Sequence, residues 1–121
     1  MPIVPNAAFV ASLCAGDSVT LVNGATGAGA SPIRFSLAPK HTGGTYLLSL
    51  QAIRTGTFTS LLANVEQSTD FGNSWNTVRT GIDFVRNPIS QVMDLAPGPI
   101  FRLNITQFAG GTSVVVNGVP N

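Results

Sequence analysis

The turn that decides this fold reads Ser68-Thr69-Asp70-Phe71-Gly72-Asn73-Ser74-Trp75 and lies between two strand-like stretches. Ser and Asp side chains in such a segment can bond nearby backbone groups and hold a tight turn. Gly72 can adopt the positive φ that a residue with a Cβ resists. Trp75 is expected to enter the next strand and to bury its ring in the core. The segment therefore predicts a β-hairpin clamped by Ser68, Asp70, Gly72 and Trp75.

Outward from this turn, the chain alternates between short apolar stretches and turn signals. The stretches are rich in Val, Ile, Leu, Thr and Phe, and the breaks between them hold Gly, Pro or Asn, as in Asn23-Gly24 and Pro97-Gly98-Pro99. Turns spaced about 8–12 residues apart are typical of an all-β sandwich or barrel. The expected strands are Phe9–Leu13, Ser18–Asn23, Ile33–Leu37, Thr45–Thr55, Thr57–Gln67, Trp75–Arg79, Ile82–Val85, Ser90–Leu95, Ile100–Gln107 and Ser113–Val119.

The length of 121 residues predicts one domain with a real hydrophobic core. We expect a single antiparallel β-sandwich, jelly-roll or immunoglobulin-like, over residues 9–121. Met1–Asn6 holds two prolines and no charged side chain, so it does not start a regular element easily. Residues 1–8 are therefore interpreted as an extended N-terminal arm, with a loose terminus as the alternative.

Alternation of apolar and polar residues indicates which side chains face the core. It is clearest in Ile100–Gln107, where every second residue is large and apolar. Tyr46–Ala52 alternates too, although Leu47 and Ile53 make its second face partly apolar. Apolar residues on both faces favour burial on both sides, by a second sheet within and a neighbour outside. The expected core residues are Tyr46, Leu48, Leu50, Trp75, Phe101, Leu103 and Ile105.

The chain carries little charge. Charged residues make up 9% of it, against about 25% in ordinary soluble chains, and the formal net charge is +1. Two interpretations stay open: a neutral β surface of the extracellular type, or a surface covered by partner subunits. The six basic residues are scattered singly, which argues against nucleic-acid binding. No stretch approaches the roughly 20 apolar residues of a membrane span, and no signal-peptide pattern is visible, so we expect folding in a cytoplasm.

Few side chains of this chain could act in catalysis or bind a metal ion. His41 is the only histidine and lies in a glycine turn, and no nucleophile-elbow sequence supports a Ser–His–Asp triad. The five acids show no second carboxylate pair for a glycosidase. Calcium at Asp70 and Asn73 is less favoured than a purely structural turn. Cys14 is the only cysteine and is expected to be a small buried side chain. We therefore expect no catalytic residue, no cofactor and no metal.

The turn pattern Ser-x-Asp-x-Gly-x-Ser-Trp closely matches the motif known as the Asp box. Asp boxes recur in sialidases and other β-propeller glycosidases, where they lie in peripheral hairpins away from the catalytic centre. One copy in 121 residues cannot build a propeller, because each blade takes about 40–50 residues. Phe71, at the tip of the turn, is the residue of this motif that we expect to make an external contact, either with a glycan or with a neighbouring chain.

Five stretches of the chain occur in a familiar order: Gly43–Leu48, Thr55–Ser68, the Asp-box turn, Pro97-Gly98-Pro99-Ile100-Phe101-Arg102-Leu103-Asn104-Ile105 and Gly110-Gly111-Thr112-Ser113-Val114-Val115-Val116. This order of motifs resembles that of small tailed-phage virion proteins. Such proteins often have Asp-Gly-Gly where this chain has Asp70-Phe71-Gly72. The resemblance covers residues 44–118. It implies a β-sandwich structural component, such as a capsid decoration, cement or neck/tail accessory protein, and it implies no catalytic residues.

We therefore expect a non-enzymatic virion protein, made in the host cytoplasm, that self-associates as a homotrimer. Its other partners would be major capsid or neck/tail proteins, with no nucleic acid and no membrane. The alternative is a glycan-binding or adhesin module with its site at Phe71. The interface candidates are Ile3, Val4, Pro5, Phe9, Phe58 and Phe71.

Overall fold

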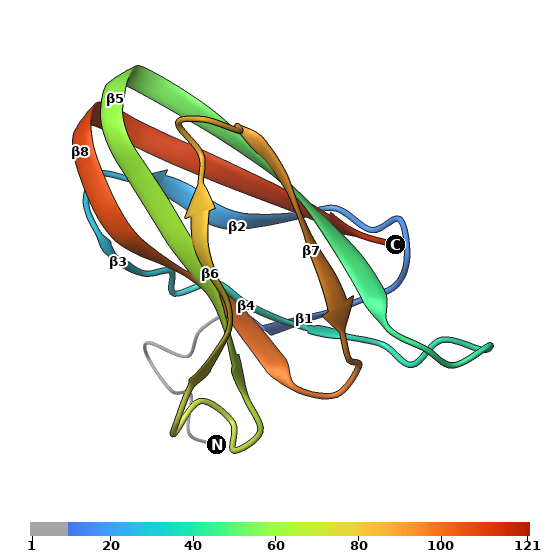
Figure 1. Ribbon diagram of the computed structural model, residues 1–121. Helices are drawn as coiled ribbons and strands as arrows, with labels where there is room; N and C mark the ends of the chain where they lie inside the picture. The colour runs from blue at the N-terminus through green and yellow to red at the C-terminus, as the bar shows by residue number, and fades with distance from the viewer. Residues whose placement is uncertain (1–9) are drawn as a thin grey trace.

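The computed structural model describes residues 10–121 and is all-β, as the sequence predicts (Figure 1). The described residues contain no helix, and so none that could cross a membrane. Eight strands form one continuous sheet. They are β1 (Val10–Leu13), β2 (Val19–Ala25), β3 (Gly29–Ala30), β4 (Arg34–Leu37), β5 (Tyr46–Ser68), β6 (Asn76–Asp83), β7 (Ile89–Leu95) and β8 (Ile100–Pro120).

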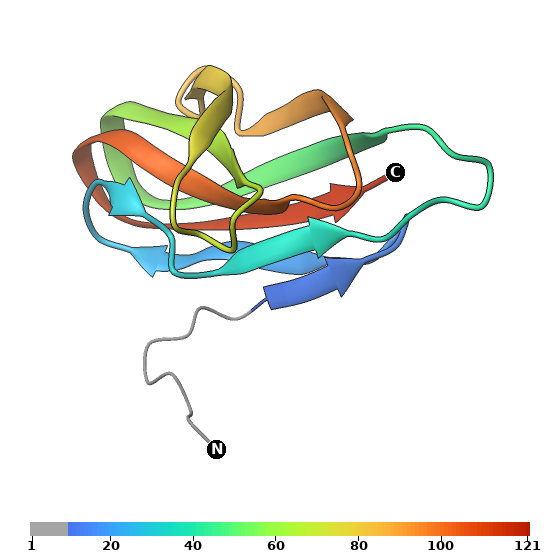
Figure 2. The same cartoon turned by 90° about the horizontal axis from the view of Figure 1, so that it is seen from below.

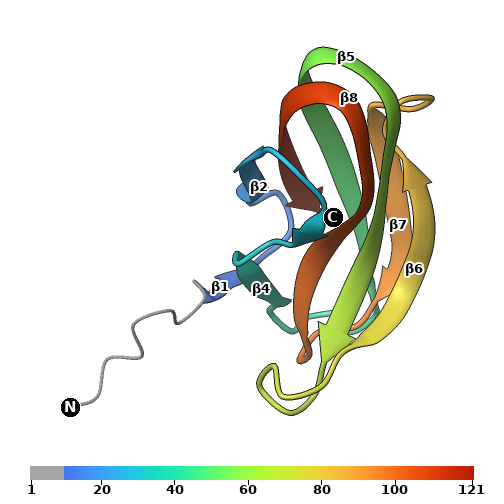
Figure 3. The same ribbon diagram turned by 90° about the vertical axis from the view of Figure 1, so that its left-hand side faces the viewer.

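The two longest strands, β5 and β8, organise the fold. They pair antiparallel along most of their length and bend over together at one end of the molecule (Figure 3). The sequence predicts a break in each, but both run through the bend without interruption. Gly56 and Gly110 make this possible, because both have a φ of 88° that a residue with a Cβ resists. A Cβ on Gly110 would also lie 2.8 Å from the Thr57 carbonyl oxygen.

The bend folds the sheet into two layers, which we name after their edge strands. The β7 layer has the order β2, second half of β8, first half of β5, β7. The β6 layer has the order β1, β4, first half of β8, second half of β5, β6, with β3 also pairing to β8. Apart from β1, the two layers follow the strand order of a jelly roll, a double-sheet sandwich. Every pairing is antiparallel except that of β1 with β4, which lie side by side in Figure 2.

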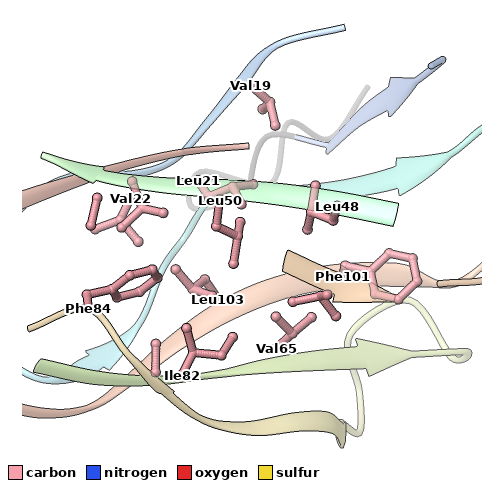
Figure 4. Close-up of a cluster of buried hydrophobic side chains, with 14 of the residues drawn as sticks. Val19, Leu21, Val22, Leu48, Leu50, Val65, Ile82, Phe84, Phe101 and Leu103 are labelled. Carbon is pink, nitrogen blue, oxygen red and sulfur yellow. The ribbon is translucent and has the colours of Figure 1, made fainter. Parts of the chain in front are cut away.

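The core lies between the two layers. Leu48 and Leu50 of the β7 layer face Val65, Phe101 and Leu103 of the β6 layer (Figure 4). Burying each such side chain contributes about 1.5–3 kcal/mol. Six of the seven expected core residues are at most 2% exposed: Tyr46, Leu48, Leu50, Phe101, Leu103 and Ile105. The prediction is wrong for Trp75, which is half-buried and lies outside this core.

Three further expectations need correction. Phe58 is not an interface residue, because its ring is 8% exposed, covers Gly111 and packs edge-on against Phe108. Cys14 is exposed, since it lies in the turn after β1, where its backbone N–H donates to Asp17. The expected strands on either side of residue 80 form the single strand β6. The arm (residues 1–8) and the interface candidates Ile3, Val4, Pro5 and Phe9 lie outside the described residues.

Candidate functional site

The turn between β5 and β6 is held by a compact set of hydrogen bonds. The Ser68 hydroxyl donates to the Asp70 carboxylate over 2.6 Å and accepts from the Gly72 N–H over 2.8 Å. The Asp70 carboxylate also accepts from the backbone N–H and the hydroxyl of Ser74, over 2.9 and 2.6 Å. These hydrogen bonds lower the pKa of Asp70 to about 2, and the bond from Ser68 has the largest effect, followed by those from Ser74. The carboxylate therefore serves the turn and stays ionised at neutral pH.

Phe71 occupies the tip of this turn in a strained conformation. Its φ is 58°, in the left-handed region, and its side chain is 87% exposed. Such a conformation costs a residue with a Cβ about 1–2 kcal/mol. At a backbone position that favours glycine, this chain has a large aromatic ring facing solvent. A strained, exposed aromatic side chain motivates a search for an external contact.

Trp75 lies on the outer face of the β6 layer, which explains why it is absent from the core. Its ring centroid is 4.0 Å from the guanidinium carbon of Arg102 on β8 and 5.3 Å from that of Arg34 on β4. Its indole N–H donates to the Gly72 carbonyl over 3.1 Å. Figure 2 shows the hairpin loop beside β4. An indole ring with a satisfied N–H and nearby cations is stable in this half-exposed position.

A carboxylate completes this cluster. The Glu66 carboxylate on β5 accepts hydrogen bonds from Arg102 Nε over 2.7 Å and from the Asn104 amide over 3.1 Å. Glu66 is only 9% exposed. Arg34 adds a second guanidinium, whose Nε is buried without a hydrogen-bond partner. We call Arg34, Glu66, Trp75, Arg102 and Asn104 the Trp75 cluster. It ties the hairpin to β4, β5 and β8, and its polar groups are largely satisfied within the chain.

The outer face of the β7 layer is chemically different. The side chains that face outward on this layer come from alternate residues of three strands: 47, 49, 51 and 53 on β5, 89, 91 and 93 on β7, and 115, 117 and 119 on β8. All of these residues are uncharged. Ile53, Ile89 and Met93 are 50%, 66% and 69% exposed. A shallow depression on this face is lined by Ser49, Gln51, Ile89, Asn117 and Val119, among others. The face is therefore uncharged and partly apolar.

The structure brings the expected turn residues together and leaves other candidates apart. Ser68, Asp70, Gly72 and Trp75 form one bonded unit. His41 is exposed on a separate loop. Within residues 10–121, no group of three or more His, Cys, Asp or Glu side chains is placed to hold a metal ion.

The sequence indicated a partly apolar second face at Leu47 and Ile53, but it did not reveal the Trp75 cluster or the exposed side chains of β7. The roles of Arg34, Glu66 and Arg102 depend on pairings between strands far apart in the sequence. The exposure of Ile89 and Met93 depends on β7 being an edge strand. The alternation of Ile89, Gln91 and Met93 with the buried Val92 was the available signal.

Comparisons with known proteins add little beyond the fold. No family model matches the sequence, and no curated protein matches it. The fold is similar to the crystal structure of the SPBc2 prophage-derived protein YomS, with a TM-score of 0.45 and 13% sequence identity. The match covers 87% of this chain and 92% of that one. At this degree of likeness, no function is transferred from that protein to this chain.

Proposed function

We propose that this protein is a non-enzymatic structural protein of a phage virion, which self-associates and docks on the capsid or on the neck or tail to stabilise the particle. The observation that carries the proposal is the uncharged outer face of the β7 layer, on which Ile53, Ile89 and Met93 are half or more exposed. Apolar patches of this kind mark contact surfaces. A face without charge brings no electrostatic repulsion to a neighbouring subunit.

Two further features support the same proposal. The motifs of residues 44–118 resemble those of small tailed-phage virion proteins. The jelly-roll strand order is one that viral capsid domains use, although lectins use it as well and a fold alone does not assign a function. A non-enzymatic role also fits Asp70, because its carboxylate is occupied by Ser68 and Ser74.

Particle association is the direct test. Antibodies raised against the purified protein would be used on density-gradient fractions of particles produced from the genome that encodes this chain. We expect the protein to sediment with the particles and to label them at regular positions in electron micrographs. Recovery of all the protein in the soluble fractions, with unlabelled particles, would contradict the proposal.

A glycan-binding or adhesin module is the second candidate, favoured by one observation. Phe71 presents a ring that is 87% exposed, at a position where its backbone is strained, and exposed aromatic rings are typical platforms for sugars. A glycan array probed with the protein would test this. Binding should be lost with Phe71→Ala and kept with Phe71→Tyr, which retains the ring. An array without any hit overturns this candidate and leaves the virion proposal in place.

A further inference from the structure

We propose that β7 is a docking strand for β7 of a second copy of this chain, so that two β7 layers join edge to edge about a two-fold axis. This inference deepens the proposed self-association and rests on it. The surface is one sheet edge, the partner is an identical chain, and the pairing is antiparallel.

Within residues 10–121, β7 is an edge strand, since it pairs with β5 alone. The Ala52 N–H donates to the Pro88 carbonyl over 2.7 Å. Residues opposite each other in an antiparallel pair alternate between bonded and non-bonded pairs. Because Pro88 bonds to Ala52, the residues two and four positions later, Ser90 and Val92, also direct their peptide groups toward β5. Those of Ile89 and Gln91 point to the free edge, where only water or another strand can bond them.

The other described edges are protected in ways that edge strands commonly are. β2 and β6 each pair with an irregular register that shifts twice, and β6 also carries Arg79 and Asp83. β1 is only four residues long. In β7 the register is regular over Ile89–Val92, and its one shift comes later, next to Asp94. Of the longer edges, β7 is the one open to regular pairing.

The sequence of β7 is complementary to itself. In an antiparallel pair centred on Gln91, Ile89 lies opposite Met93 of the second copy, and Met93 lies opposite Ile89. These two side chains are 66% and 69% exposed in the single chain, and cross-strand apolar pairs stabilise sheets. Ile53 lies on the neighbouring strand, near Ile89, because Gln51 pairs with Ile89. The three apolar side chains would thus form a continuous strip across both copies.

The charges beside β7 favour the same arrangement. Arg86 precedes the strand and Asp94 lies near its end, and both are exposed. When two copies of the strand run in opposite directions, Arg86 of one copy comes to the same end of the pair as Asp94 of the other. Each end of the pair then carries one positive and one negative side chain, which favours the antiparallel arrangement. A parallel pairing would place like charges together.

The proposed pairing makes a dimer, whereas the sequence led us to expect a homotrimer. A two-fold pairing uses the same edge of both subunits. A closed three-fold ring would need β7 to pair with a different edge, and the irregular register of β2 and β6 opposes regular pairing.

The first test is mass by light scattering at micromolar concentration. The full chain should have twice its 12.5 kDa mass. Gln91→Pro removes an N–H that points to the free edge, where proline is tolerated, and should halve the mass. Ile89→Lys should do the same by placing a charge in the pair. Val78→Lys makes the same kind of change on β6, at a side chain that is 40% exposed, and should leave the dimer intact.

A disulfide tests the register. In a Cys14→Ser background, Gln91→Cys places two cysteines opposite each other at about 5.5 Å between Cα atoms, within disulfide reach. Oxidation should convert the chain to a covalent dimer. Ile89→Cys is the control, because its two copies would lie roughly 13 Å apart along the strands, and it should stay uncrosslinked.

The outcomes separate this inference from the proposed function. A dimer that is lost with Gln91→Pro and Ile89→Lys and crosslinked by Gln91→Cys supports it. A monomeric chain, a trimer, or a dimer that resists both β7 changes overturns it. Particle association in the earlier test would leave the virion role standing in each of those cases, although a monomeric chain would remove self-association from it.

Discussion

The two outer faces of this sandwich expose different kinds of side chain to solvent. On the β6 layer, the Trp75 cluster gathers Arg34, Glu66 and Arg102 around one aromatic ring, and the chain supplies most of their partners. On the β7 layer, Ile89 and Met93 are left exposed among uncharged neighbours. The first face is largely complete within one chain, whereas we propose that the second continues into a second copy through β7.

Measurements of the free energy of unfolding test whether the two faces differ in this way. Changes on the β6 face should lower the free energy of unfolding of the single chain. Changes on the β7 face should leave that free energy nearly constant and alter association instead. If both faces behaved alike, the division between an internally bonded face and a contact face would fail.

Glu66→Ala should have the largest effect, a loss of about 3 kcal/mol in the free energy of unfolding. The change removes the carboxylate bonded to Arg102 Nε and to Asn104 and leaves a partly buried guanidinium unpaired. Urea unfolding followed by circular dichroism measures it. Ser49→Ala, on the β7 face, is the control and should change the free energy by less than about 0.5 kcal/mol. Equal losses for the two variants would contradict the comparison.

Trp75→Ala should cost about 2 kcal/mol, from the lost contacts with Arg34 and Arg102 and the lost apolar area. Removal of a fully buried Trp would cost about 3–5 kcal/mol, so the measured value distinguishes a surface clamp from a core residue. Trp75→Phe keeps a ring for the guanidinium groups and should lose less. A loss near 4 kcal/mol would indicate that Trp75 is a buried core residue.

Acid should weaken the hairpin through Asp70. The pKa of this carboxyl is about 2 in the folded chain, against an ordinary value of 3.8. Because the folded value is the lower one, the contribution to stability is complete above about pH 4 and is lost as the pH falls from 4 toward 2. The unfolding free energy of the wild type should fall more steeply over this range than that of Asp70→Asn, which has no carboxyl to titrate. Parallel pH profiles would show that the turn bonds contribute nothing.

Alternation of residue types was enough to predict the all-β class and most of the core. Phe101, Leu103 and Ile105 repeat every second residue, and all three are buried. The continuity of β5 through Gly56 was not predictable by the same reasoning, because a glycine at positive φ is typical of a break. Only pairing with β8 over both halves keeps the strand intact through the bend.

The surfaces were harder to predict because they depend on which strands become neighbours. Trp75 is large and apolar, so composition favours burial, yet its position before β6 places it over Arg102 on the outer face. Glu66 and Arg102 are 36 residues apart and meet only through the register of β5 with β8. Alternation within 89–93 indicates which side chains share a face, but only the strand order shows that Ile89 lies on an edge strand.

The smallest effect on the single chain should come from the β7 face. Met93→Lys replaces a side chain that is 69% exposed, so the monomer should lose less than about 0.5 kcal/mol. Its effect should appear in the concentration dependence of unfolding instead. A dimer is stabilised by mass action, so the wild-type Tm should rise with protein concentration. The Met93→Lys Tm should stay constant, and Val78→Lys on β6 should keep the wild-type dependence. A wild-type Tm that does not depend on concentration would contradict the pairing of β7 with a second copy.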